Sequence, residues 1–190
     1  MTLLNPKPRL LLTGASGFLG YNIVMQAKER YQVLGTVNQH GYTTQHGLQQ
    51  ARLNLTDRLA LRNLVRESHP DAIIHTAAVS DINLCQQQPT ETAVLNVEVA
   101  VLLANLAAEL GIPFVFTSTD LVFDGTKGGY TEEDAVNPIN KYGEQKVMAE
   151  AGIRQAYPDA AICRMPLMYG VGGPGSKNFF LPISCWSIII

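Results

Sequence analysis

The sequence has little charge and no excess of either sign. Charged residues make up 16% of its 190 residues, and the formal net charge is -2. Without a basic excess, the chain has no electrostatic basis for binding nucleic acid or an anionic membrane surface. The 46% of hydrophobic residues argue against a disordered chain. The length fits one domain, or one domain with part of a second.

Cysteines are scarce as well. Cys85, Cys163 and Cys185 are widely spaced and form neither a CxxC pair nor a zinc-type cluster with histidines. Their odd number argues against a disulfide framework, so we expect a reducing, cytoplasmic compartment and no metal site. The N-terminus lacks the charged-then-apolar order of a signal peptide. No membrane span is expected, because polar residues interrupt the long apolar stretch at 94–110.

Short apolar runs alternate with helical patterns along the chain, which predicts βαβ units and a doubly wound parallel sheet. The strand order expected for this Rossmann arrangement is 3-2-1-4-5-6. The expected strands are Arg9–Leu12, Gln32–Val37, Arg52–Leu55, Asp71–His75, Pro113–Ser118 and Ala160–Met165. The expected helices are Phe18–Arg30, one capped by Thr56 and ending near Glu67, Glu91–Leu110, and one capped by Asn140.

A glycine-rich turn lies between the first strand and the first helix. Residues 13–20 are Thr-Gly-Ala-Ser-Gly-Phe-Leu-Gly. Glycines at this place allow a tight turn and a close approach of the backbone to a pyrophosphate, which the helix N-terminus then binds. A turn without a ligand is the alternative, but the strand before it and the helix after it favour a dinucleotide.

The end of the second strand bears on the choice of cofactor. A carboxylate at this place usually accepts a hydrogen bond from the ribose 2′-OH of NAD. Val37 is followed instead by Asn38, Gln39 and His40. The missing carboxylate favours NADPH slightly, yet no arginine is present to bind a 2′-phosphate. Both NADP and NAD therefore stay open.

Two further segments are candidates for lining a dinucleotide. Asn54 and Leu55 could border the adenine, with Asp57 either as its polar contact or as an acidic residue favoured by a helix dipole. Ala77 and Ala78 follow the fourth strand, where the strand order reverses and ligands bind. Their small side chains would let a dinucleotide pass, or would simply allow close packing.

Tyr142 and Lys146 form the most informative pair. Four residues is about one helical turn, so both side chains lie on one face of the predicted helix. An ammonium beside a phenol stabilises the phenolate, which predicts a lowered pKa for Tyr142 and proton transfer to or from a carbonyl oxygen. Thr119 ends the fifth strand and could donate to the same oxygen. The long loop Asp120–Ile139 indicates a functional segment.

Together these motifs resemble the extended short-chain dehydrogenase/reductase family. The segments at 118–125, Ser-Thr-Asp-Leu-Val-Phe-Asp-Gly, and at 137–143, Asn-Pro-Ile-Asn-Lys-Tyr-Gly, are similar to its dTDP-4-dehydrorhamnose reductase branch. The resemblance covers roughly residues 9–178. It implies that Tyr142 is the general acid, Thr119 its partner, and Lys146 also a ligand of the nicotinamide ribose. It further implies cofactor contacts from Gly14, Ser16, Gly17, Phe18, Leu19, Asn54, Leu55, Ala77, Ala78 and Pro166, together with Tyr142 and Lys146.

The resemblance has two departures. Asn54 stands where the family often has an aspartate. Family members also continue into a small C-terminal domain that binds the sugar nucleotide, and this domain is largely missing here. We therefore expect a Rossmann domain over 1–178 and, over 179–190, an atypical apolar tail that is not a domain. A frameshift or a premature stop would explain that tail.

Three functional hypotheses follow from these observations. The first is NAD(P)H-dependent reduction of the 4-keto group of a nucleotide-linked deoxysugar, as in dTDP-rhamnose biosynthesis. The second is a non-catalytic NADP-binding subunit that resembles the regulatory subunit of methionine adenosyltransferase. The third is an inactive truncated fragment. The first implies a nucleotide-sugar substrate, and the oligomeric state stays open, with a homodimer as one option.

Overall fold

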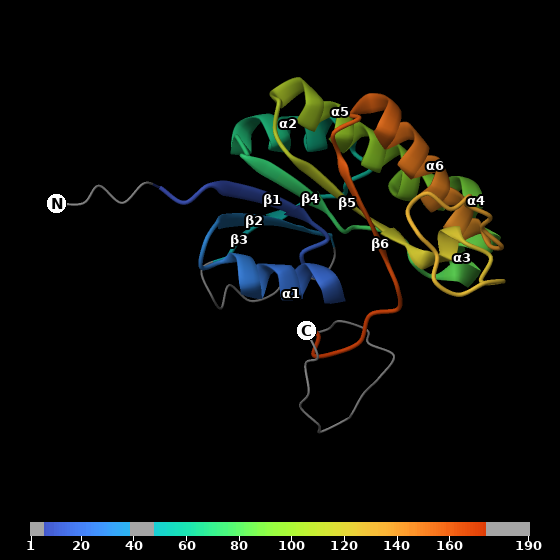
Figure 1. Ribbon diagram of the computed structural model, residues 1–190. Helices are drawn as coiled ribbons and strands as arrows, with labels where there is room; N and C mark the ends of the chain where they lie inside the picture. The colour runs from blue at the N-terminus through green and yellow to red at the C-terminus, as the bar shows by residue number, and fades with distance from the viewer. Residues whose placement is uncertain (1–5, 39–47, 174–190) are drawn as a thin grey trace.

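The computed structural model describes residues 6–38 and 48–173 (Figure 1). The apolar tail expected at 179–190, the domain boundary at 178, and Gln39, His40 and Cys185 lie outside the described residues. The described part is built on a six-stranded sheet in the order β3-β2-β1-β4-β5-β6, with every neighbouring pair parallel. The predicted fold class and strand order are therefore confirmed. The strands are β1 (Arg9–Thr13), β2 (Gln32–Val37), β3 (Gln49–Arg52), β4 (Ala72–His75), β5 (Phe114–Thr119) and β6 (Ala161–Met165).

Helices cover both faces of the sheet. The helices are α1 (Phe18–Ala27), α2 (Arg58–Ser68), α3 (Ile82–Gln87), α4 (Pro89–Ala93), the π-helix η1 (Val94–Val99), α5 (Ala100–Leu110), the 3₁₀-helix η2 (Asp120–Val122) and α6 (Lys141–Ala156). Figure 1 shows α1 on one face and α2, α5 and α6 on the other. The alternation of β1 explains the two cores, because successive strand side chains point to opposite faces. Leu11 packs with the α2, α5 and α6 side, whereas Leu10 and Leu12 pack with Val24 of α1.

The predicted position of the third strand and the predicted cap of the following helix are wrong. The strand was expected at Arg52–Leu55, but β3 is Gln49–Arg52, because residues 34–37 of β2 pair with it in that register. Thr56 does not cap α2. Its backbone N–H and its hydroxyl both donate to Asn54 Oδ1, and Asp57 is the N-cap, with Oδ1 accepting from Ala60 N at 3.0 Å.

The helical segment Pro89–Leu110 differs from expectation in two ways. It begins with the short α4 and contains a six-residue π-helix, η1, before α5. It is also long and apolar enough to cross a membrane by length and composition, whereas no span is predicted from the sequence. Packing explains its apolar side chains, since Leu103, Leu106 and Ala107 are buried in the core between the sheet and α6.

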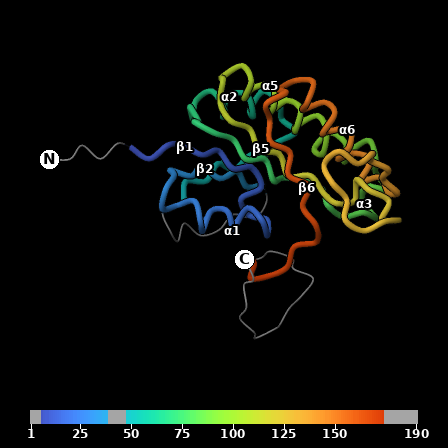
Figure 2. Tube along the Cα trace, viewed as in Figure 1, coloured from blue at the N-terminus to red at the C-terminus, as the bar shows by residue number. Residues whose placement is uncertain are grey.

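The chain returns toward α1 after β6. The tube in Figure 2 shows this segment leaving the edge of the sheet and running to the side where α1 lies. Asn22 of α1 donates from Nδ2 to the Val171 carbonyl oxygen at 3.1 Å. Residues far apart in sequence therefore meet beside the N-terminus of α1, near the glycine-rich turn.

Candidate functional site

The glycine-rich turn between β1 and α1 has a geometry that only glycine fits. Gly14 has a φ of +72°, and a Cβ there would lie 2.8 Å from Ala77 N. A Cβ at Gly20 would lie 2.2 Å from the Gly14 carbonyl oxygen. The turn closes through a hydrogen bond from Gly17 N to Gly14 O at 2.9 Å. The missing side chains thus bring the first turn of α1 and the end of β4 into direct contact with this loop.

A cavity of about 380 Å³ lies above this turn, at the carboxyl ends of β1, β2 and β4. This is the edge at which open α/β sheets bind ligands. Seven of the predicted cofactor contacts line it together: Gly14, Ser16, Gly17, Asn54, Leu55, Ala77 and Ala78. Asn38, which follows β2 directly, also lines the cavity and supplies no carboxylate.

The remaining predicted contacts lie elsewhere. Phe18 and Leu19 open α1 and are not among the residues that line this cavity. Pro166 follows β6 directly and is exposed. Asn54 has both of its polar turn contacts to Thr56, and Asp57 caps α2. The structure therefore gives Asp57 the helix-terminus role that was one of its two alternatives.

Lys146 is buried deeply against the sheet. Only 2% of the residue is exposed, and Nζ donates to the Thr117 carbonyl oxygen at 2.6 Å. The same ammonium lies 4.0 Å from the centroid of the Phe116 ring, a favourable cation–π contact. Burial lowers the pKa of Lys146 to about 7, and the negative charge of Glu150 opposes that shift.

Tyr142 does not have the lowered pKa that its spacing from Lys146 predicted. Burial of the phenol raises the pKa of Tyr142 to about 12, and the charges of Cys85 and Asp120 act in the same direction. The prediction is wrong because desolvation disfavours the phenolate. The Lys146 ammonium is also directed at the Thr117 carbonyl oxygen.

Thr119 ends β5 as predicted and is 7% exposed. Its hydroxyl donates to Asp120 Oδ1 at 3.1 Å and accepts from Leu121 N at 3.2 Å, so it caps η2. The η2 segment packs on the first turn of α6, since a Cβ on Gly143 would lie 2.3 Å from the Leu121 carbonyl oxygen. Tight packing thus holds the end of β5 against the helix that carries Tyr142 and Lys146.

Histidine at the end of β4 is a packed residue. His75 is 1% exposed, lies 2.6 Å from Thr13 Oγ1 through Nδ1, and stacks on Phe116 with ring centroids 5.8 Å apart. Burial, with a smaller contribution from Lys146, lowers the pKa of His75 to about 3. The ring is therefore neutral at physiological pH and adds no charge beside Lys146.

Two buried polar networks are not predicted from the sequence. In the first, Glu150 accepts from Ser118 and from Arg164. Its position four residues after Lys146 continues the series that begins at Tyr142, and this spacing could have revealed it. In the second, Asn96 of η1 accepts from Val79 N at 2.8 Å and donates to Val79 O at 2.9 Å.

The second network also reaches the helix of Tyr142. Asn96 Nδ2 donates to Gln145 Oε1 at 2.7 Å, and Gln145 Nε2 donates to Pro89 O and Thr92 Oγ1. Because Val79 lines the cavity above the glycine-rich turn, this network joins the cavity wall to α6. Nothing in the local sequence around Asn96 marks this role, since its partners are 17 and 49 residues away.

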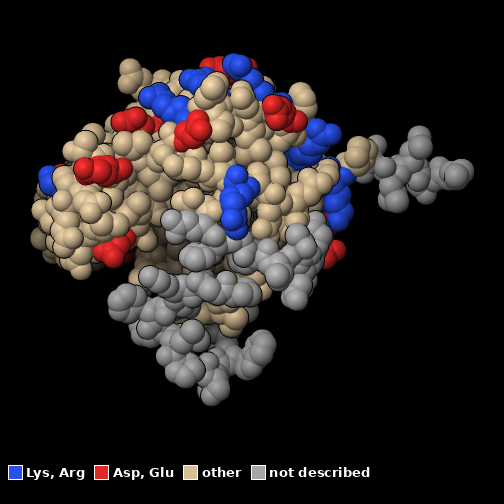
Figure 3. All heavy atoms as spheres, turned by 180° about the vertical axis from the view of Figure 1, so that it is seen from behind, with Lys and Arg blue, Asp and Glu red and all other residues tan. Residues whose placement is uncertain are grey.

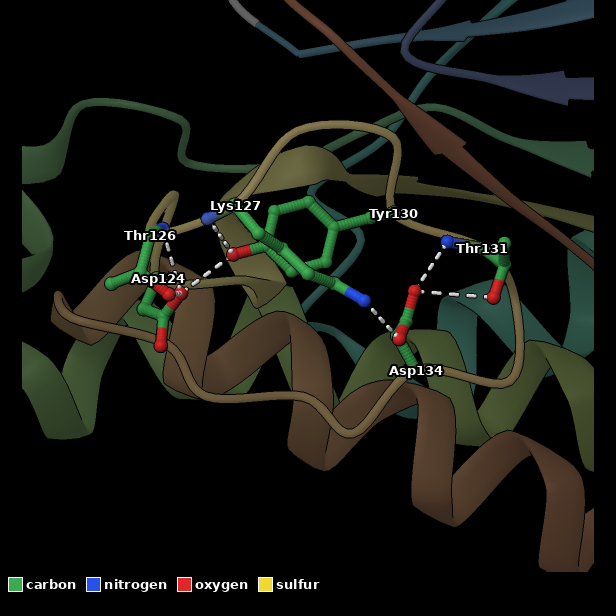
Figure 4. Close-up of polar contacts among 6 residues, drawn as sticks. All are labelled: Asp124, Thr126, Lys127, Tyr130, Thr131 and Asp134. Atoms are coloured by element: carbon green, nitrogen blue, oxygen red, sulfur yellow. Dashed lines mark hydrogen bonds and ion pairs between the residues drawn. The ribbon is translucent and has the colours of Figure 1, made fainter.

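The loop Asp120–Ile139 has a defined structure of its own (Figure 4). Asp124 accepts from the Tyr130 hydroxyl at 2.6 Å and from Thr126 N at 2.9 Å, and these bonds hold its pKa well below the usual range. Lys127 pairs with Asp134 further along the loop. A cavity of about 410 Å³ lies between this loop and β6, lined by Asp120, Leu121, Phe123, Asp124, Gly125, Tyr130, Thr131, Glu132, Ile139 and Arg164. Asp120, which lines this cavity, directly follows Thr119.

Charge on one face of the molecule has no single sign. Lys and Arg side chains lie among Asp and Glu side chains on the face shown in Figure 3. Within residues 6–38 and 48–173, no group of three or more His, Cys, Asp or Glu side chains has the arrangement of a metal site.

These features define a Rossmann-type α/β protein whose glycine-rich turn and cavity lie where such proteins bind dinucleotides. A family profile described as RmlD substrate binding domain matches residues 8–183, and the chain belongs to this family. The resemblance stated from the motifs is thereby confirmed.

Solved structures agree with this assignment. A hypothetical dTDP-4-dehydrorhamnose reductase from Sulfolobus tokodaii is 34% identical, with a TM-score of 0.76, over 83% of this chain and 55% of that one. A dTDP-4-dehydrorhamnose reductase from Bacillus anthracis in complex with NADP is 28% identical, with a TM-score of 0.77, over 91% and 57% of the two chains.

Curated relatives include proteins of a different description. Methionine adenosyltransferase 2 subunit beta of Xenopus laevis is 37% identical over 87% of this chain and 48% of its own length. The probable low-salt glycan biosynthesis reductase Agl14 of Haloferax volcanii is 35% identical over 90% and 57%. The chain thus spans about half the length of the curated relatives it matches.

Proposed function

We propose that this chain forms the NAD(P)-binding and proton-transfer part of a reductase of the dTDP-4-dehydrorhamnose reductase type. Its reaction is reduction of the 4-keto group of a nucleotide-linked deoxysugar. The observation that carries the proposal is the position of Thr119, Tyr142 and Lys146. Thr119 lies at the carboxyl end of β5, and Tyr142 and Lys146 lie on α6, which packs against β5. The cavity at the glycine-rich turn lies at the same carboxyl edge of the sheet.

The residues at the turn fit a dinucleotide. Any side chain at Gly14 would collide with the cavity wall at Ala77, so the backbone itself is available to a pyrophosphate. Gly14, Ser16 and Gly17 would hold that group at the N-terminus of α1. The nicotinamide supplies the hydride when it is bound. The absence of a carboxylate at Asn38 favours NADPH slightly, and the NADP complex of the Bacillus anthracis relative supports this choice.

Tyr142 is suited to supply the proton. With its pKa raised to about 12, the phenol is fully protonated at neutral pH, which is the form that a general acid requires. Hydride addition to the carbonyl carbon creates an alkoxide, and the Tyr142 O–H bond breaks as its proton passes to that oxygen. Lys146 would stabilise the resulting phenolate, and Thr119 would orient the carbonyl oxygen. The cavity beside Asp120 would receive the sugar.

The decisive experiment compares Tyr142→Phe with the native chain. Reduced cofactor and dTDP-4-dehydrorhamnose are mixed with the protein, and oxidation of the cofactor is followed by absorbance. We expect kcat to fall by about 100-fold or more, the low end of acid–base contributions. Tyr31→Phe is the matched control, since this tyrosine ends the turn before β2 and is 37% exposed. Full turnover by Tyr142→Phe would overturn the mechanism.

A second candidate is a non-catalytic subunit that binds NADP and regulates a partner enzyme. The identity of 37% to methionine adenosyltransferase 2 subunit beta of Xenopus laevis favours it. The two candidates separate in one comparison, in which the native chain is tested for keto-sugar turnover and for an effect on a methionine adenosyltransferase catalytic subunit. Cofactor binding without turnover, together with an altered partner activity, would favour the regulatory role.

A further inference from the structure

Lys146 is a buried cation with few partners. Its hydrogen bond to the Thr117 carbonyl oxygen and its contact with the Phe116 ring are both to uncharged groups. Such contacts compensate only part of the free energy that burial of an ammonium costs. Because the pKa of Lys146 is about 7, a substantial fraction of the side chain is neutral at physiological pH. A neutral lysine cannot stabilise a phenolate.

Glu150 is a buried carboxylate on the same helix as Lys146. It lies one turn beyond Lys146 on α6 and is 4% exposed. Ser118 Oγ donates to Oε1 at 2.6 Å, and Arg164 donates to Oε1 from Nε at 3.1 Å and to Oε2 from Nη2 at 2.7 Å. These donors from β5 and β6 therefore hold the Glu150 carboxylate of α6 in a fixed position.

The other charged groups around α6 contribute less to Lys146. From β4, His75 is neutral. From β6, Arg164 is itself paired with Glu150. From α3, Cys85 is a buried thiol whose pKa is raised by burial. The acidic residues of the remaining neighbours, Asp120 of η2, Glu98 of η1 and Glu109 of α5, are exposed to solvent. Lys146 binds the Thr117 carbonyl oxygen and Glu150 binds the Ser118 hydroxyl, so the two buried side chains of α6 contact adjacent residues of β5. Among the described residues, Glu150 is thus placed for its charge to raise the pKa of Lys146.

We propose that Glu150 is a positioning residue of the reductase site, which keeps the Lys146 side chain charged beside β5. This role rests on the proposed function, because it supports the lysine that would stabilise the Tyr142 phenolate. Arg164 and Ser118 hold Glu150 in place, so the network joins α6 to β5 and β6 at the height of the catalytic residues.

The sign of the effect follows from electrostatics. A nearby negative charge favours the charged form of a lysine, so removing it lowers the lysine pKa. In a Glu150→Gln chain, Lys146 would lose its proton at a lower pH and be mostly neutral at pH 7. The alkaline decline in kcat would move to lower pH by the same interval. If Glu150 only stabilised the fold, its replacement would lower the free energy of unfolding without changing the pKa of Lys146.

The experiment is a lysine titration that needs no substrate. Protein labelled with ¹³C at lysine Cε is titrated by NMR, and the Lys146 signal is identified by its loss in Lys146→Met. We expect the midpoint in Glu150→Gln to fall by about one pH unit, the low end of the effect of an opposite charge. Glu150→Asp should lie between the two. Glu144→Gln is the matched control, since this glutamate is on the same helix but is 44% exposed and paired with Lys141.

An unchanged Lys146 midpoint in folded Glu150→Gln would overturn the proposal. If that variant does not fold, Glu150→Asp decides the question. Its carboxylate is withdrawn by one methylene, so a midpoint below the native value supports the proposal and an unchanged one overturns it. Because the titration involves neither cofactor nor keto-sugar, its result is independent of the Tyr142→Phe test. Failure of this proposal can therefore be distinguished from failure of the proposed function.

Discussion

Burial of Lys146 should lower the free energy of unfolding at neutral pH. Its replacement by methionine measures this effect. The lysine has a pKa of about 7 in the folded chain, against an ordinary pKa of 10.5. At about 1.4 kcal/mol per pKa unit, the difference corresponds to about 4–5 kcal/mol of destabilisation at pH 7 and below. Methionine has a similar length and needs no solvation, so it removes this penalty.

Part of the gain is offset by lost contacts. The Thr117 carbonyl oxygen loses its donor at 2.6 Å, which costs about 1–3 kcal/mol for a buried acceptor. The contact with the Phe116 ring also loses its charge, although methionine still packs on an aromatic face. The expected net result is that Lys146→Met is more stable than the native chain at pH 7 by about 2 kcal/mol and is inactive as a reductase.

The pH dependence provides the check. A lysine with a lowered folded pKa binds fewer protons in the folded state, so native stability rises between pH 7 and about pH 10. The advantage of Lys146→Met should therefore shrink by about 2 kcal/mol between pH 7 and pH 9. Urea unfolding of both proteins across this range measures the difference. A variant that is less stable at pH 7, or a difference that does not change with pH, would refute the reasoning.

Two further predictions concern the glycine-rich turn and the long loop. Gly20→Ala places a Cβ 2.2 Å from the Gly14 carbonyl oxygen, so it should lower the free energy of unfolding by about 3 kcal/mol and weaken NADPH binding; unchanged urea midpoint and affinity would contradict this. Asp124→Asn should speed amide exchange in the loop at neutral pH, because the carboxylate accepts from Tyr130 and Thr126. The native loop should loosen similarly only in acid, since a lowered carboxyl pKa gives stability that is lost as pH falls; equal exchange in both proteins at pH 7 would refute it.

A strand of the sheet could be predicted where its own residues form a recognisable strand pattern. Strands β1, β4 and β5 are apolar runs between turn residues, and their buried side chains face helices on both sides. The third strand could not be placed from its own residues. Gln49–Arg52 has a weak strand composition, and only its pairing with Leu34–Val37 of β2 fixes the register. The π-helix is a similar case, because the hydrogen bonds of Asn96 reach Val79 and Gln145.

The candidate site was predictable in its local motifs and not in its supporting networks. The glycine turn and the spacing of Tyr142 and Lys146 are short patterns, so the sequence shows them directly. Glu150 and its partner Arg164 lie on α6 and β6, and Ser118 lies on β5. Hydrogen bonds between elements distant in sequence have no local pattern, and the sheet topology alone brings them together.

The pKa of Tyr142 shows why spacing could predict a pair of residues and not its electrostatics. A lysine one turn away lowers a tyrosine pKa only if its charge is near the phenol oxygen and outweighs the desolvation of the phenolate. Here the ammonium is directed at the Thr117 carbonyl oxygen, and burial dominates. The same burial lowers the pKa of Lys146, so each residue of the pair is shifted toward its neutral form. A phenol that keeps its proton and a lysine that needs a carboxylate to stay charged are a consistent arrangement for a proton donor. Tyr142 gives up its proton only when an alkoxide forms. Glu150 then determines whether Lys146 is charged and can stabilise the Tyr142 phenolate.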